Sequence, residues 1–199
     1  MTTIILASAS PQRRKLIKVL GLPFLIKPSR VQEKEILTKD VVHLVKHNAL
    51  LKAQEVVRRE DSFLKTGQTV IVVGCDTVVF SYKKRLILKP KSFKEAKKNL
   101  QELMERPHWV YSGLAAIDVK SGKTLVDYEK TKVFMNQLSS KEIDRYHRKV
   151  SPLDKAGGFD IEGKGALFIP RIEGCYFNVV GLPLAKLVEM LRKLKIEVL

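Results

Sequence analysis

The sequence predicts a mixed α/β fold in which helices flank a twisted sheet. Short apolar segments typical of strands alternate along the chain with segments that have the periodicity of amphipathic helices. The run over residues 69–74 is β-branched and uncharged, the pattern of a strand that is covered on both faces. With 199 residues and 45% hydrophobic content, the chain can bury a sizeable core. We expect one domain over residues 1–199. Whether this domain has two lobes about a cleft is left open.

Caps and breakers place the elements of the first half. Residues 4–6 are predicted as a strand, and Ser10 with Pro11 begins a helix over residues 12–20. A Gly-Leu-Pro segment at 21–23 ends that helix, and residues 24–26 form a second strand. A long helix then runs from 41 to about 59, with Thr38 or Asp40 as its cap.

The second half follows the same alternation. A hairpin pairs residues 78–80 with 85–88, and Ser92 caps a helix that runs to about residue 104. Strands are predicted at 108–111, 114–119 and 125–135, before a helix that begins at Ser139 or Ser140 and continues through residue 146. A glycine-rich stretch with brief strands follows, and Pro183 opens a C-terminal amphipathic helix.

Composition narrows the class of partner and the compartment. A net charge of +16 calls for an anionic partner: nucleic acid, a membrane surface or a phosphorylated small molecule. The basic residues are dispersed and lack an aromatic-rich RNA-binding motif, so nucleic acid has little support. No apolar run approaches the ~20 residues of a membrane span, and the N-terminus lacks the features of a signal peptide. Cys75 and Cys175 suit reduced thiols, so we expect a cytoplasmic protein without a membrane partner.

The junction between the first strand and the first helix has the features of an anion site. Ser10 and Pro11 leave backbone N–H groups free at the helix N-terminus, and Arg13 and Arg14 add guanidinium groups there. An ordinary capped surface helix with two solvated arginines explains the same residues equally well.

One carboxylate follows the most apolar strand. Asp76 comes after Gly74, at a place where α/β sheets gather ligands, although an Asp there often only caps a turn. Lys52 on the long helix and Lys89 before a proline are candidate cations, and each is also explained as a solvated lysine. His108 is interpreted as structural. P-loop, dinucleotide-binding, zincin and nucleophile-elbow motifs are all absent from the sequence, which leaves other phosphate chemistries.

Seven segments, in this order along the chain, form one recognisable pattern: residues 6–14, Lys52-Ala53, residues 74–78, Lys89-Pro90, and residues 108–113, 154–157 and 178–184. Together they resemble the Maf family of nucleotide pyrophosphatases, and the resemblance spans nearly the whole chain. It implies a fold related to inosine triphosphate pyrophosphatases with a cleft between two lobes, and a homodimer. It also implies cleavage of a nucleoside triphosphate to the monophosphate and pyrophosphate with a divalent metal cation, Mg²⁺ or Mn²⁺.

The resemblance also implies roles for individual residues. Asp76 would be the catalytic carboxylate and a metal ligand, and Glu33 a second metal ligand. The implied phosphate-binding set is Ser8, Ser10, Arg13, Arg14, Lys52 and Lys89.

The resemblance implies that Lys155 and Glu162 take part in base recognition. The branch that acts on dTTP and UTP typically has glutamine where this chain has Glu162, and an ionised carboxylate only accepts hydrogen bonds. Because the Asp154-Lys155 start matches that branch, we expect dTTP and UTP as substrates. A preference for 7-methyl-GTP or another triphosphate is the alternative within the family, and a nucleotide- or nucleic-acid-binding regulator of cell division without hydrolysis is the alternative outside it.

Overall fold

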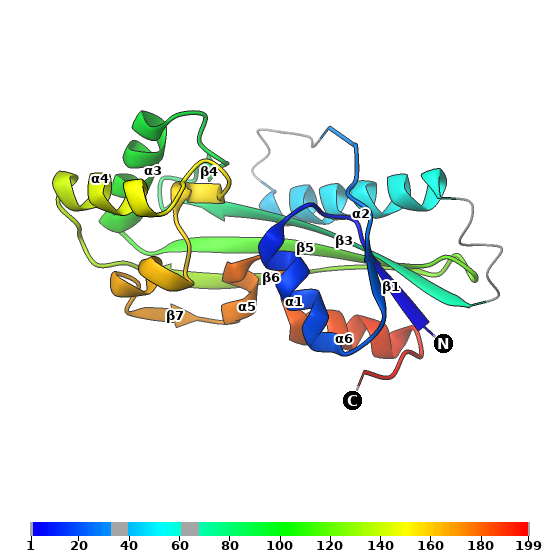
Figure 1. The fold of residues 1–199 in the computed structure, drawn as a ribbon. Helices are drawn as coiled ribbons and strands as arrows, with labels where there is room; N and C mark the ends of the chain where they lie inside the picture. Colours follow the sequence, from blue (N-terminus) through cyan, green and yellow to red (C-terminus); the bar gives the residue numbers. More distant parts are fainter. Residues whose placement is uncertain (1, 33–39, 61–67, 199) are drawn as a thin grey trace. The chain divides into compact units, whose positions relative to one another are not determined.

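A computed structural model describes residues 2–32, 40–60 and 68–198, and it contains a mixed seven-stranded sheet flanked by helices (Figure 1). The strand order is β2-β1-β3-β5-β6-β7, with β4 paired to β3. β1 is parallel to β2 and β3, whereas the β3–β4 and β6–β7 pairs are antiparallel. The strands are β1 (Thr2–Leu6), β2 (Phe24–Ile26), β3 (Thr69–Phe80), β4 (Leu86–Ile87), β5 (His108–Asp118), β6 (Thr124–Phe134) and β7 (Arg171–Glu173). The mixed α/β class is confirmed.

Six α-helices and three 3₁₀ segments complete the described chain. None of the described helices is both long and apolar enough to cross a membrane. The α-helices are α1 (Pro11–Ile17), α2 (Val41–Arg59), α3 (Phe93–Glu105), α4 (Ser140–Lys149), α5 (Tyr176–Val180) and α6 (Leu184–Lys193), and the 3₁₀ segments are η1 (Lys18–Leu20), η3 (Ala156–Gly158) and η4 (Gly163–Leu167).

The chain divides into two compact units. The first comprises Met1–Asp76, Ser112–Glu129 and Gly181–Leu199, and the second comprises Thr77–Tyr111 and Lys130–Val180. β3, β5 and β6 each contribute residues to both units.

The core of the first unit forms where α2 packs on the sheet. Ala49, Ala53 and Val56 of α2 are fully buried in one cluster with Val70 and Val72 of β3. Small helix side chains allow a close approach, because the separation of a helix from a sheet depends on the side chains between them. This packing fixes the inner face of α2, including the polar residues that lie on it.

The core of the second unit joins α3 and α4 to the sheet. Leu100 and Leu103 of α3 and Ile143 of α4 are completely buried in one cluster with Val110 of β5 and Val133 of β6. α4 begins with a capping box between Ser139 and Glu142, which satisfies backbone N–H groups at the helix start.

Several predicted bounds are confirmed and others are wrong. α2 has the predicted bounds, with Asp40 as its cap. The first predicted helix is instead α1 followed by η1. The predicted strand ends at Gly74 and near Gly113 are wrong, since β3 and β5 run through both glycines. Each glycine lies where the α2 backbone comes close, so its small size serves helix packing and does not end the strand.

Candidate active site

A buried ion pair joins α2 to β3 in the first unit. Lys52 Nζ lies 2.7 Å from Asp76 Oδ1, and the two residues are only 7% and 4% exposed. Asn48 Nδ2 donates to Asp76 Oδ2 at 3.1 Å, and Lys52 Nζ also donates to the Cys75 carbonyl at 3.3 Å. Asp76 therefore lies inside β3, not after it as predicted, and both of its carboxylate oxygens accept hydrogen bonds from α2.

Burying this ion pair has a cost in folding free energy, which indicates that the pair is kept for function. Removing a lysine and a carboxylate from water costs several kcal/mol per ion, and an apolar pair of the same volume is often as stable. Burial of Lys52 excludes the alternative of a solvated helical lysine. Charged groups held in fixed positions are what phosphate chemistry requires, so the pair marks the candidate site.

Sequence reasoning missed Asn48, although a signal was present. Asn48 precedes Lys52 by four residues on the same helix, and residues at that spacing share a helix face. Asn48 is 3% exposed, so its amide is part of the inner face of α2. A candidate role for Lys52 therefore also made Asn48, one turn earlier on the same helix face, a candidate.

The predicted cap of the first helix is confirmed. Ser10 is the N-cap of α1, Pro11 opens the helix, and the Ser10 hydroxyl accepts a hydrogen bond from Arg13 N at 3.4 Å. The Ser8 hydroxyl accepts from Ser10 N at 3.3 Å and from Arg13 Nη1 at 3.2 Å. Both serine hydroxyls therefore take part in the local hydrogen bonds of the strand–helix junction.

Arg13 ties three parts of the first unit together. Its Nε donates to the Gly181 carbonyl at 2.8 Å and its Nη1 donates to the Cys75 carbonyl at 2.9 Å. Cys75 Sγ also lies 3.2 Å from the Gly181 carbonyl oxygen. Because Cys75 precedes Asp76, these hydrogen bonds fix the backbone beside the buried carboxylate. The structure thus brings together Ser8, Ser10, Arg13, Lys52 and Asp76.

The other predicted phosphate and metal residues are Arg14, Lys89 and Glu33. Arg14 is exposed on α1. Lys89 is exposed in the second unit, and Glu33 lies outside the described residues. Their predicted roles stay predictions.

The predicted base-recognition loop belongs to the second unit. Lys155 Nζ lies 2.6 Å from Asp154 Oδ1 and donates to the Ser151 carbonyl at 3.1 Å. Glu162 is half-buried at the N-cap of η4. Burial raises the pKa of Tyr176, and the charge of Glu162 raises it further, so the Tyr176 phenol lies within electrostatic reach of that carboxylate.

Asp160 holds the loop together through its hydrogen bonds. Its Oδ1 accepts hydrogen bonds from the Tyr146 hydroxyl at 2.9 Å and from Gly165 N at 3.1 Å. The Tyr146 hydroxyl in turn accepts from Asp160 N at 3.0 Å. The Asp160 carboxylate is therefore committed to loop structure.

The residues around Asp76 fit a divalent cation held mainly by its substrate. Among the described residues, no group of three or more His, Cys, Asp or Glu side chains could hold a metal ion. One carboxylate has about four lone-pair positions, and hydrogen bonds from Lys52 and Asn48 use two of those on Asp76. Mg²⁺ commonly binds through one or two carboxylates together with water and substrate phosphates, which matches this donor set.

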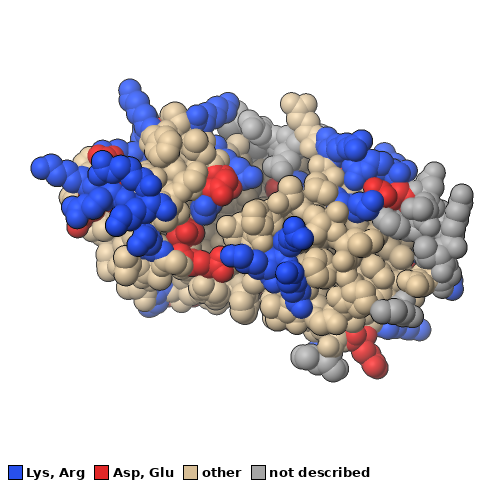
Figure 2. All heavy atoms as spheres, viewed as in Figure 1, with Lys and Arg blue, Asp and Glu red and all other residues tan. Residues whose placement is uncertain are grey.

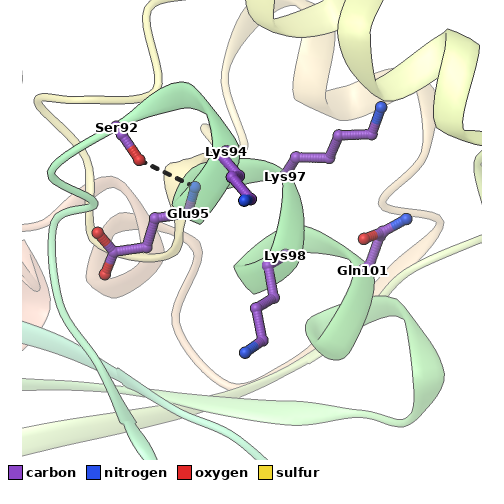
Figure 3. A pocket seen from close by; sticks show the side chains of 6 residues that line it. All are labelled: Ser92, Lys94, Glu95, Lys97, Lys98 and Gln101. Atoms are coloured by element: carbon purple, nitrogen blue, oxygen red, sulfur yellow. Dashed lines mark hydrogen bonds between the residues drawn. The ribbon is translucent and has the colours of Figure 1, made fainter.

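A separate hollow lies on α3. It is lined by Ser92, Lys94, Glu95, Lys97, Lys98 and Gln101, and Ser92 caps the helix through Glu95 N at 3.2 Å (Figure 3). None of these residues belongs to the predicted site. Figure 2 shows that lysine and arginine are spread over much of the visible face, so a group of lysines is not distinctive in this chain.

Comparison with known proteins bears on the whole chain. A family model described as "Maf-like protein" matches residues 3–194. A protein of Alkaliphilus oremlandii named dTTP/UTP pyrophosphatase is 43% identical over 192 residues, which is 96% of each chain. A protein of Bacillus thuringiensis subsp. konkukian with the same name is 40% identical over 100% of this chain and 98% of its own length. The Staphylococcus aureus Ham1 protein structure aligns with a TM-score of 0.45 at 15% identity, covering 67% of this chain and 71% of that one.

Proposed function

The chain belongs to the Maf family, and from this premise we propose that it is an enzyme that hydrolyses dTTP and UTP to the nucleoside monophosphate and pyrophosphate. Relatives about 40% identical over their full length bear the name dTTP/UTP pyrophosphatase. The observation that carries the proposal is the buried ion pair of Lys52 and Asp76, at 2.7 Å, on the inner face of α2.

The chemistry of the site follows from the charge of the substrate. A triphosphate carries close to four negative charges, which cations must offset before a nucleophile can approach phosphorus. Lys52 supplies one such cation from a fixed position, because α2 and Asp76 hold its ammonium group. Ser8, Ser10, Arg13, Arg14 and Lys89 are the other groups proposed to bind phosphate.

Arg13 has a second task beside phosphate binding. Its hydrogen bonds to the Gly181 and Cys75 carbonyls keep the β3 backbone in place next to Asp76. A rigid support matters, because a displacement of about 1 Å at a reacting group can cost a hundredfold in rate.

We assign metal binding to Asp76, with Glu33 as the second proposed ligand. Mg²⁺ or Mn²⁺ bound there would neutralise phosphate charge and acidify a bound water. Asn48 and Lys52 orient the carboxylate for this role through their hydrogen bonds to its two oxygens. Lys155 and Glu162 are proposed to contact the base. A homodimeric state and a cytoplasmic location, which the resemblance and composition suggest, stay predictions.

A substrate panel tests the proposal directly. Pyrophosphate release would be measured with dTTP, UTP, CTP and 7-methyl-GTP in the presence of Mg²⁺ or Mn²⁺. We expect dTTP and UTP to give the highest kcat/KM. A preference for 7-methyl-GTP would contradict the substrate assignment, and no pyrophosphate from any triphosphate would favour a binding regulator instead.

The variant Asp76→Asn tests the assigned carboxylate. The amide keeps the shape of the side chain but removes its negative charge, so we expect kcat to fall by about 10²–10⁴-fold while nucleotide still binds. Asp144→Asn is the matched control, because that carboxylate lies on α4 and pairs with Lys97. Equal activity of the Asp76 variant and the wild type would remove Asp76 from the mechanism.

A further inference from the structure

The sheet of the second unit has one face that carries rings and cations in place of a core. Trp109 of β5, Lys130, Lys132 and Phe134 of β6, and Arg171 of β7 form this face, which we term the aromatic–basic face. Side chains alternate across a strand, and the neighbouring residues Val110, Val133 and Ile172 belong to the hydrophobic cluster on the opposite side.

Cations lie over both rings of the aromatic–basic face. Lys130 Nζ and Lys132 Nζ are 5.2 and 5.7 Å from the centre of the Trp109 ring. Lys132 Nζ is 5.1 Å from the centre of the Phe134 ring, and the Arg171 guanidinium carbon is 3.9 Å from it. Phe134 and Arg171 are register partners across the β6–β7 pair, so the backbone fixes this contact.

The composition of this face indicates a ligand that is a polyanion and also contains planar rings. The face carries three cations, and Arg171 pairs with the Glu173 carboxylate at 3.3 Å. Lys130 and Arg171 are exposed, and both rings are half-buried. Tyr111, two residues after Trp109, extends the aromatic surface and meets Phe80 edge to face with ring centres 6.5 Å apart. Long, flexible side chains that place cations over rings provide for phosphates and for planar bases at the same place, because the charged groups can leave the rings when a phosphate binds.

We propose that the aromatic–basic face binds single-stranded nucleic acid. The charged groups of Lys130, Lys132 and Arg171 move off the rings to pair with phosphates, and bases stack on the faces of Trp109 and Phe134 that these groups leave. A duplex fits less well, because its bases are already stacked on one another. A second copy of the chain also fits less well, because a twofold interface would place three cations against the same three cations. This binding is independent of the proposed hydrolysis, since no residue of the face belongs to the candidate active site.

The first experiment measures affinity and its dependence on salt. The probe is a 3′-labelled oligodeoxyadenylate with a 5′-hydroxyl group, about 20 nucleotides long, which exceeds the ~4–16 nucleotides of known single-strand sites. The affinity for an oligoadenylate of the same length is measured in the same way to compare RNA with DNA. Binding is followed by anisotropy at several salt concentrations, and by the fluorescence of Trp109, the one tryptophan of the chain. We expect quenching of Trp109 on binding.

Two matched variants distinguish binding at the aromatic–basic face from attraction by the overall positive charge. The variant Lys130→Gln/Lys132→Gln/Arg171→Gln should make the plot of log affinity against log salt shallower by about 2, since each phosphate contact on a single strand contributes about 0.7. The variant Lys94→Gln/Lys98→Gln/Lys141→Gln removes the same charge from exposed positions on α3 and α4 and should bind much as the wild type does. Equal losses in the two variants would overturn the proposal.

Variants of the ring test stacking without a change in charge. Trp109→Leu should weaken binding by about tenfold or more, and Trp109→Phe should restore most of the affinity, because any aromatic ring can stack with a base. Pyrophosphate release should be unchanged in both variants and confirms that they fold. Wild-type affinity of the Trp109→Leu variant would overturn the proposal. So would a wild-type dimer that the triple variant of the face dissociates, because the face would then be an interface between copies.

Discussion

His108 shows how one buried side chain links stability to pH. It is completely buried, Nδ1 donates to the Leu103 carbonyl at 3.2 Å, and Nε2 has no hydrogen-bond partner among the described residues. Burial lowers the pKa of His108 from 6.5 to about 4, against a smaller opposite effect of the Leu103 hydrogen bond. The neutral ring packs edge to face against Phe159, which agrees with the structural role predicted from the sequence.

The pKa of His108 predicts a loss of stability in acid. Below pH 6.5, His108 binds a proton in the unfolded chain but stays neutral in the folded protein. The free energy of unfolding therefore falls as the pH drops from 6.5 towards 4, by up to about 3 kcal/mol. Above pH 6.5 this effect is absent. Urea unfolding between about pH 4.5 and 7.5 should show a flatter pH dependence for His108→Gln than for the wild type.

His147 is the control for this measurement. Burial also lowers its pKa, and it contacts the Gly158 carbonyl at 3.1 Å, so it contributes to the same slope. His147→Gln should therefore retain the part of the slope that His108 causes. If His108→Gln and the wild type had equal slopes, proton uptake at His108 would not govern acid stability.

Single residues also show what the sequence could and could not predict. Asp76 and Lys52 were both candidates, because a carboxylate in an apolar segment and a lysine on a helix face can be recognised locally. The hydrogen bond from Arg13 to Gly181 could not be predicted in this way, since it joins residues 168 positions apart. The aromatic–basic face was missed for the same reason, because its rings and cations come from three strands.

At the scale of elements, two glycines set the distance between α2 and the sheet. A Cβ atom at Gly113 of β5 would lie 2.0 Å from the Val45 carbonyl oxygen, and one at Gly74 of β3 would lie 2.1 Å from the Ala49 carbonyl oxygen. Both atoms belong to the α2 backbone, which cannot move aside as a side chain can. The predicted strands ended at or near these glycines, whereas each glycine lies within a strand and allows the α2 backbone to approach closely.

This packing predicts the cost of one added methyl group. Gly113→Ala should destabilise the protein by about 3 kcal/mol in urea unfolding, because α2 must shift away from the sheet. Gly122→Ala is the control: its Cβ atom would meet nothing within 4 Å, but the residue has a φ of +71°. That strain should cost about 1 kcal/mol. Equal costs for the two substitutions would mean that close approach of α2 is not what requires Gly113.

At the scale of the whole molecule, the fold class was predictable, but the positions at which the chain divides into two units were not. The alternation of apolar and amphipathic segments indicated the mixed sheet. Three of the four boundaries between the two compact units follow Asp76, Tyr111 and Glu129, each inside a continuous strand, and the fourth follows Val180 at the end of α5. A boundary inside a strand leaves no linker in the sequence, because the strand continues across it.

The net charge of +16 is also a property of the whole molecule, and it predicts how salt affects the proposed reaction. The positive charge attracts a triphosphate before contact, over a screening length of about 30 Å in 0.01 M salt but only about 8 Å in 0.15 M salt. We therefore expect kcat/KM for dTTP to fall by about tenfold over that range, whereas kcat changes little, because salt screens the approach of the substrate more than the groups that hold it in a buried site. The variant Lys94→Gln/Lys98→Gln/Lys141→Gln lowers the net charge without touching the site, so its kcat/KM should depend less steeply on salt. Equal salt dependence of this variant and the wild type would mean that contacts within the site, not the field of the molecule, control substrate capture.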